Sequence, residues 1–77
     1  MEKYLNDFQI GEVGSVKKVL AEGKIKRRLF DMGVTLNAII TLKKVAPLGD
    51  PIQVLIRGYD LTLRRDEANK VLMEVEE

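Results

Sequence analysis

Four cationic side chains fall within five residues of this chain, and they are its sharpest candidates for binding chemistry. Lys24, Lys26, Arg27 and Arg28 could bind a phosphate backbone or the acidic surface of a protein partner. The alternative is a solvated helix face with no ligand. A protein that binds single-stranded nucleic acid normally interleaves aromatic side chains for base stacking, and Phe30 is the one aromatic residue in this segment. Nucleic acid is therefore the least favoured of the three interpretations.

The rest of the composition argues against enzyme chemistry. The chain has no cysteine and no histidine, which removes the Ser/His and Cys/His pairs and the commonest transition-metal ligands. Asp60, Asp66 and Glu67 are close in sequence, but no pattern arranges them around one point, and Asp66 and Glu67 favour the start of a short helix. We therefore expect no catalytic residue, no cofactor and no tight metal site. The charge balance of 13 Lys and Arg against 12 Asp and Glu demands no long-range attraction to nucleic acid or membrane.

A short helix must carry the basic cluster. Ile25, Leu29 and Met32 recur at the i, i+4, i+7 spacing of one apolar helix face, which predicts a helix from residue 24. Gly33 stands where a glycine commonly ends a helix. Leu29 is expected in the core, and the basic side chains are expected on the remaining faces.

The other periodic segments predict strands. Alternation and β-branched residues place them at 13–20, 38–46, 52–57, 59–63 and 72–75. Residues 64–70 suit one or two helical turns, and 1–12 an extended lead-in. The expected inward-facing residues are Ile40, Leu42, Ile52, Val54 and Ile56, and Tyr59, Leu61 and Leu63 are expected to share a face.

The segment 46–51 holds two prolines and a Gly-Asp pair, which cannot lie inside a sheet and predict an ordered loop between strands. Leu48 in this loop belongs to no strand face. If its side chain points outward, it could form an apolar patch with Leu36, Met32 or Val34. The alternative is a loop folded back over a thin core.

Together these elements predict one small domain over residues 1–77, mainly β with short helices. About five strands, a helix inserted after the first strand and a helical turn before the last suggest a small, partly open β-barrel. No stretch approaches the roughly 20 apolar residues of a membrane span, so we expect a soluble, intracellular protein without membrane insertion.

Three blocks in this order resemble the FeoA family, the small cytoplasmic component of bacterial ferrous-iron uptake. They are Arg28-Leu29 with Met32-Gly33, the loop from Ala46 to Pro51, and Gly58 to Leu63 followed by Arg64 to Ala68. The chain also resembles the C-terminal domain of iron-dependent repressors of the diphtheria-toxin-repressor type. The resemblance covers roughly residues 8–75 and implies an SH3-like β-barrel. Leu36-Asn37 departs from the Pro-Gly turn common in the family, which leaves an apolar side chain near a loop tip.

The resemblance implies a cytoplasmic, non-enzymatic accessory protein that docks on the GTP-binding region of the ferrous-iron permease, of FeoB type. Two alternatives remain: a stand-alone RNA-binding barrel, and a regulatory peptide-binding module related to the iron-dependent repressors. We expect Arg28, Met32, Leu36 and Leu48 to contact the partner, with Lys26 and Arg27 adding electrostatic steering.

Overall fold

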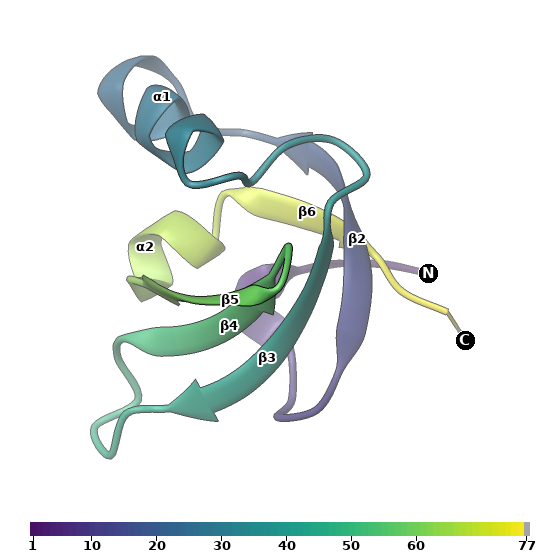
Figure 1. The fold of residues 1–77 in the computed structure, drawn as a ribbon, viewed down its shortest axis with the longest axis vertical. Helices are drawn as coiled ribbons and strands as arrows, with labels where there is room; N and C mark the ends of the chain where they lie inside the picture. Colours follow the sequence, from purple (N-terminus) through teal and green to yellow (C-terminus); the bar gives the residue numbers. More distant parts are fainter. Residues whose placement is uncertain (77) are drawn as a thin grey trace.

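The computed structural model describes residues 1–76 as a strongly bent antiparallel sheet with short helices at its ends (Figure 1). In chain order the elements are β1 (Glu2–Tyr4), the 3-10 turn η1 (Leu5–Asp7), β2 (Val13–Val19), α1 (Gly23–Asp31), β3 (Ile39–Val45), β4 (Ile52–Ile56), β5 (Tyr59–Leu63), α2 (Arg65–Ala68) and β6 (Val71–Glu74). The mainly β fold with short helices is confirmed. The domain predicted over residues 1–77 includes Glu77, which lies outside the described residues.

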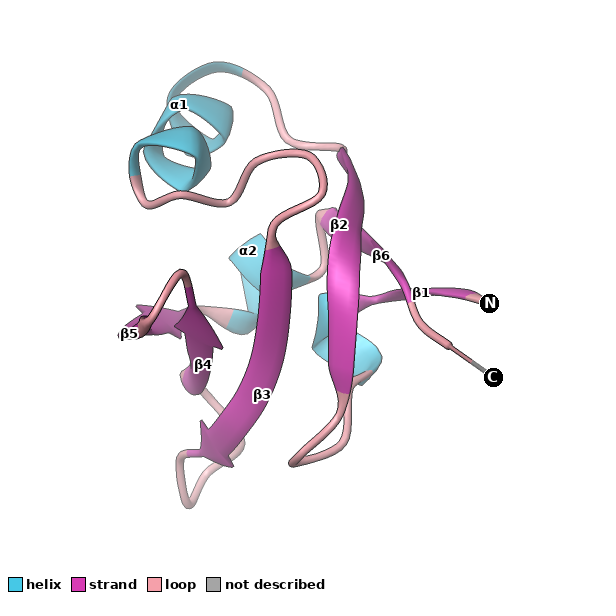
Figure 2. Cartoon of the chain, turned by 45° about the vertical axis from the view of Figure 1, so that its right-hand side comes forward, coloured by secondary structure: helices cyan, strands magenta, loops and turns pink. Residues whose placement is uncertain are grey.

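The sheet has six strands in the order β1-β6-β2-β3-β4-β5, one more than predicted. The additional strand is β1, which pairs with β6 from Glu2 opposite Glu74 to Tyr4 opposite Leu72. Residues 1–12 were predicted as an extended lead-in with no strand assigned, because three residues with two charges show no alternation; residues 2–4 of this segment in fact pair as a strand. The strands at the two ends of this order, β1 and β5, do not pair with each other, and the sheet is therefore open, as predicted (Figure 2).

The core lies inside the bend of the sheet. Its inward-facing residues on β3 and β4 are the predicted ones, and all are buried: Ile40, Leu42, Ile52, Val54 and Ile56. The predicted apolar face of α1 is only partly used, because Leu29 is fully buried whereas Ile25 remains 41% exposed. The reason is position, since α1 lies across one end of the sheet rather than over its face (Figure 1).

Strands β2 and β3 share an unusual pattern. In each strand three residues are buried, half-buried and buried in turn, at 14–16 in β2 and 40–42 in β3. Two exposed lysines then follow, Lys17-Lys18 in β2 and Lys43-Lys44 in β3. Two neighbouring residues cannot both face solvent in a regular strand. In both strands the register shifts at the first lysine of the pair, and this bulge turns both side chains outward.

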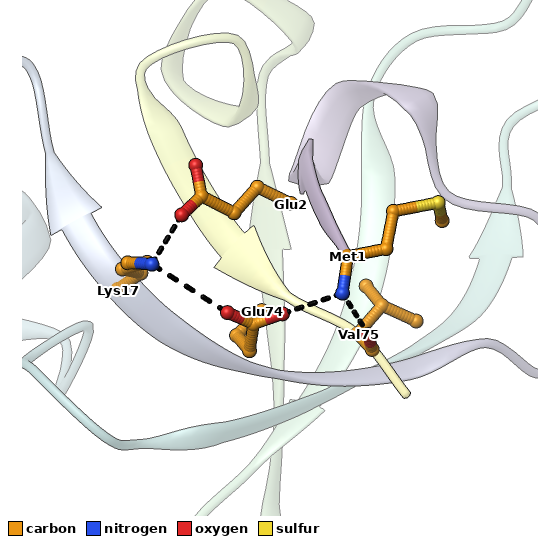
Figure 3. Close-up of polar contacts among 5 residues, drawn as sticks. All are labelled: Met1, Glu2, Lys17, Glu74 and Val75. Carbon is orange, nitrogen blue, oxygen red and sulfur yellow. Dashed lines mark hydrogen bonds and ion pairs between the residues drawn. The ribbon is translucent and has the colours of Figure 1, made fainter. Parts of the chain in front are cut away.

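An ion-pair network joins the three strands nearest the chain ends (Figure 3). Lys17 of β2 contacts the carboxylates of Glu2 on β1 and Glu74 on β6. The Met1 ammonium donates to Glu74 at 2.7 Å and to the Val75 carbonyl at 2.9 Å. The ammonium contact lowers the pKa of Glu74, and the hydrogen bond to Glu2 raises the pKa of Lys17. Because these groups are exposed, each pair stabilises the fold only slightly.

Acid sensitivity is expected from a second pair. The Glu12 carboxylate accepts the backbone N–H of Gln9 at 2.9 Å and the ammonium of Lys3 at 3.0 Å, and these contacts lower the pKa of Glu12. The stabilisation is therefore present above the carboxyl's unfolded-state pKa and is lost as pH falls through its lower folded-state pKa. Glu12→Gln should lower the free energy of unfolding by about 1 kcal/mol at neutral pH and reduce its fall in acid.

Urea unfolding of Glu12→Gln from neutral to acidic pH would measure both the loss of stability at neutral pH and the smaller loss in acid. Glu22→Gln is the matched control, because Glu22 is exposed and its side chain makes no capping hydrogen bond. Equal curves for the two variants would show that the contacts of Glu12 do not stabilise the fold.

Candidate protein-docking surface

The position of α1 is set by the way the helix ends. Gly33 has φ +93°, its N–H donates to the Phe30 carbonyl at 3.0 Å, and the N–H of Val34 donates to the Leu29 carbonyl at 2.9 Å. This is the Schellman arrangement, in which a left-handed residue closes the helix. Leu29 and Val34 are both fully buried, so the same motif fixes the helix to the core. The predicted helix end at Gly33 is confirmed.

The β4–β5 turn holds the same helix end from outside. Arg57 donates from Nε to the Gly33 carbonyl at 3.3 Å and from Nη2 to Thr35 Oγ1 at 2.6 Å. The Tyr59 hydroxyl donates to the Met32 carbonyl. Met32 is half-buried and packs against the core. Its backbone is therefore held in place, and only part of its side chain is available to a partner.

Arg28 faces α2. Its Nη1 lies 3.3 Å from Oε2 of Glu67, whose residue is only 6% exposed. The other oxygen of Glu67 accepts the N–H of Arg64 at 3.0 Å and so satisfies the first turn of α2, which confirms the helix start predicted for Asp66-Glu67. Arg28 thus serves to join α1 to α2, although its side chain remains largely exposed.

The remaining cations of the cluster point into solvent. Lys24, Lys26 and Arg27 are exposed, and within residues 1–76 none of them forms an ion pair. The ammonium of Lys26 lies 5.6 Å from the centre of the Phe30 ring, which is itself exposed. Leu36 is 62% exposed in the connection from α1 to β3, at the same end of the molecule (Figure 1). We call Lys24, Lys26, Arg27, Phe30 and Leu36 the α1 surface.

Leu48 lies elsewhere. It is 97% exposed in the β3–β4 loop, at the opposite end of the molecule from α1 (Figures 1 and 2). Leu36 precedes β3 and Leu48 follows it, so the length of a seven-residue strand, about 20 Å, separates them. The patch that would join Leu48 to Leu36, Met32 or Val34 does not form, and Val34 is buried.

The β3–β4 loop is ordered, as predicted, because the chain hydrogen-bonds it on two sides. The Gly49 N–H donates to Ala46 at 2.7 Å within the loop. Arg65 donates from Nε to the Gly49 carbonyl at 2.6 Å and from its N–H to Oδ1 of Asp50 at 3.1 Å. Arg65 also reaches the Asn6 carbonyl at 2.8 Å, so one side chain joins the loop to η1.

Two further observations bear on what the surface can do. In the part of the chain that the structure describes, no three His, Cys, Asp or Glu side chains gather where they could hold a metal ion. None of the described helices has the length and apolar character needed to cross a membrane.

A family model for the FeoA domain matches residues 3–75. The chain belongs to the FeoA family. A FeoA-like protein from Clostridium acetobutylicum has the same fold, with a TM-score of 0.89 and 38% identity over 96% of this chain and 86% of that one.

More distant structures agree on the fold alone. FeoA of Stenotrophomonas maltophilia, a prokaryotic SH3 domain protein in complex with zinc, superposes with a TM-score of 0.81 at 24% identity, over 94% of this chain and 89% of that one. A manganese-dependent transcriptional repressor superposes with a TM-score of 0.88 at 17% identity, and the match covers 97% of this chain and 42% of the repressor. The SH3-like fold and the similarity to metal-dependent repressors are thus confirmed.

One relative with FeoA sequence is part of a much larger protein. It is the Fe(2+) transport protein A/Fe(2+) transporter FeoB fusion protein of Porphyromonas gingivalis, 31% identical over 71 residues. The match covers 92% of this chain but only 8% of that protein. In that organism a FeoA domain and a FeoB transporter are joined in one polypeptide.

Proposed function

We propose that this chain is a non-enzymatic accessory protein of ferrous-iron uptake that docks on the cytoplasmic GTP-binding region of a FeoB-type permease. The observation that carries the proposal is the fusion of a related domain to FeoB in one protein. Physical linkage keeps two domains at a high effective concentration, which is useful when they act on each other.

The α1 surface is the proposed contact. Lys26 and Arg27 provide cations that no carboxylate of the described residues neutralises, and they would steer the domain toward an acidic partner. Phe30, over which the Lys26 ammonium lies, and Leu36 in the connection that follows α1 add exposed apolar area. Arg28 and Met32 support this surface through the fold. Arg28 joins α1 to α2 by its ion pair with Glu67, and Met32 packs on the core.

Docking changes transport only if the domain binds one conformational state of the permease better than another. The binding site is therefore expected to distinguish the nucleotide states of the GTP-binding region. Iron itself would be the cargo of the permease rather than a ligand of this chain.

An NMR titration of the labelled protein with the soluble GTP-binding region, with and without nucleotide, tests the proposal. We expect shifts confined to residues 24–36 and a nucleotide-dependent affinity. The double variant K26E/R27E should raise the dissociation constant at least about tenfold, and Leu36→Asp should also weaken binding.

Leu48→Asp is the matched control, because it places the same charge on another exposed leucine, in the β3–β4 loop at the other end of the molecule. If K26E/R27E and Leu36→Asp bind with unchanged affinity and Leu48→Asp binds more weakly, the contact lies on the β3–β4 loop instead. Absence of any shift at high partner concentration would contradict docking on this region.

A further inference from the structure

The outer edge of β5 presents unpaired backbone groups. Arg57 and Gly58 form the two-residue turn between β4 and β5 with φ of 51° and 83°, as in a type I′ hairpin. Ile56 is opposite Tyr59, and in such a hairpin this flanking pair exchanges both hydrogen bonds. The backbone N–H and C=O of Tyr59, Leu61 and Leu63 therefore point to β4. Those of Asp60 and Thr62 point away from the sheet, and within residues 1–76 no backbone or side-chain partner bonds to them.

The two edges of the sheet differ in how they are protected. The edge strand β1 has three residues, and its Glu2 and Lys3 side chains are held in ion pairs. The edge strand β5 has five residues, pairs with β4 without a bulge, and contains neither lysine nor proline. It lies at the outer limit of the sheet, with no element beyond it in Figure 2. Regular edges without a bulge, lysine or proline are the ones that recruit another strand.

We propose that β5 pairs with β5 of a second copy of this chain, antiparallel, about a two-fold axis through Leu61. In this register Asp60 faces the partner's Thr62, and their outward N–H and C=O groups bond in both directions. The two-fold axis repeats this exchange on the other side of Leu61. Both sheets then continue into one.

The side chains of β5 suit this register. Asp60 and Thr62 are exposed on one face, and the pairing sets each carboxylate opposite a hydroxyl rather than a second carboxylate. On the other face Leu61 meets the partner's Leu61, and Tyr59 lies beside the partner's Leu63. Three arginines flank the strand: Arg57 and Arg65 are held by hydrogen bonds within their own chain, whereas Arg64 is exposed. Their like charges in the two copies weaken the association.

The interface is small, since it consists of one five-residue strand from each copy. Interfaces well below about 1,200 Å² typically give weak and transient association. The dimer is therefore expected to form at high protein concentration and to dissociate on dilution. The dimer contact lies on β5, outside the α1 surface. The dimer and docking on the permease can therefore be tested independently of each other.

Amide hydrogen exchange at several protein concentrations tests the register directly. The amides of Asp60 and Thr62 should exchange rapidly in dilute protein and slow at high concentration in step with dimer formation. Those of Leu61 and Leu63 should be protected at every concentration, because they already bond to β4. Rates for Asp60 and Thr62 that do not depend on concentration would overturn the proposal.

Charge placement provides the second test, with molecular mass measured by sedimentation equilibrium. Thr62→Asp sets two carboxylates opposite each other in both pairs and should weaken the dimer at least about tenfold. The double variant D60K/T62D sets opposite charges across the same pairs and should restore it. Equal dimerisation of wild type and Thr62→Asp, or failure of the double variant to recover, would overturn this register.

Discussion

Replacing Arg65 with alanine is expected to lower the free energy of unfolding by about 2–3 kcal/mol. The guanidinium donates to the carbonyl of Gly49 at 2.6 Å and to the carbonyl of Asn6 at 2.8 Å. These acceptors belong to the β3–β4 loop and to η1, two segments with no strand pairing to each other. Hydrogen bonds to a charged group contribute more than neutral ones, and their removal leaves partly buried carbonyls without a donor.

The neighbouring arginine gives a matched control. Arg64 is exposed, and within residues 1–76 its side chain forms no ion pair. Arg64→Ala should change stability by less than about 0.5 kcal/mol. Thermal or urea unfolding of both variants decides the matter, and similar losses at the two positions would show that the bonds of Arg65 do not hold the loop. Lysine at position 65 should restore little, because it lacks the planar fork that reaches both carbonyls.

Replacing Gly33 with alanine is expected to cost about 2 kcal/mol. A left-handed residue with a Cβ is strained at its φ of +93°, which accounts for about half of the loss. The rest comes from a clash, because the new Cβ would lie 2.8 Å from the Tyr59 hydroxyl oxygen. To relieve it, the tyrosine must give up its hydrogen bond to Met32. The end of α1 and the neighbouring Leu36 would then be less firmly placed.

Gly11 separates the two contributions. Its φ of +92° is nearly the same, but a Cβ built there meets no atom within 4 Å. Gly11→Ala should therefore cost only the backbone term, about 1 kcal/mol. Chemical shifts of the Tyr59 ring should move in Gly33→Ala alone. An equal loss of stability in both variants, with an unmoved Tyr59, would contradict the clash.

Much of the fold could be predicted from local patterns. Alternation located β3, β4 and β5 with their inward residues, and a single glycine marked the end of α1. These features depend on neighbours within a few residues of each other. The strand β1 escaped prediction because it is defined by its pairing with residues more than 60 positions away, not by a pattern of its own.

Less of the candidate site could be predicted from the sequence, because it too depends on contacts between residues that are distant along the chain. The sequence carried no local signal for which cation of the cluster is paired, yet Arg28 contacts Glu67 on α2, whereas Lys26 and Arg27 form no ion pair within residues 1–76. Likewise, no local signal distinguishes Arg65, which holds the β3–β4 loop, from Arg64 beside it. The sequence also suggested one apolar patch containing Leu36 and Leu48. It could not show that the full length of β3 separates the two side chains.

The strand order has a consequence for how the chain acquires its structure. The sixth strand is synthesised after all the others, yet it lies inside the sheet, between β1 and β2. Until it emerges, β1 has no partner and β2 is unpaired along one edge. Pairings across such sequence distances slow the formation of a native state. Folding is therefore expected to finish only after synthesis of residue 74, as a single late step rather than strand by strand on the ribosome.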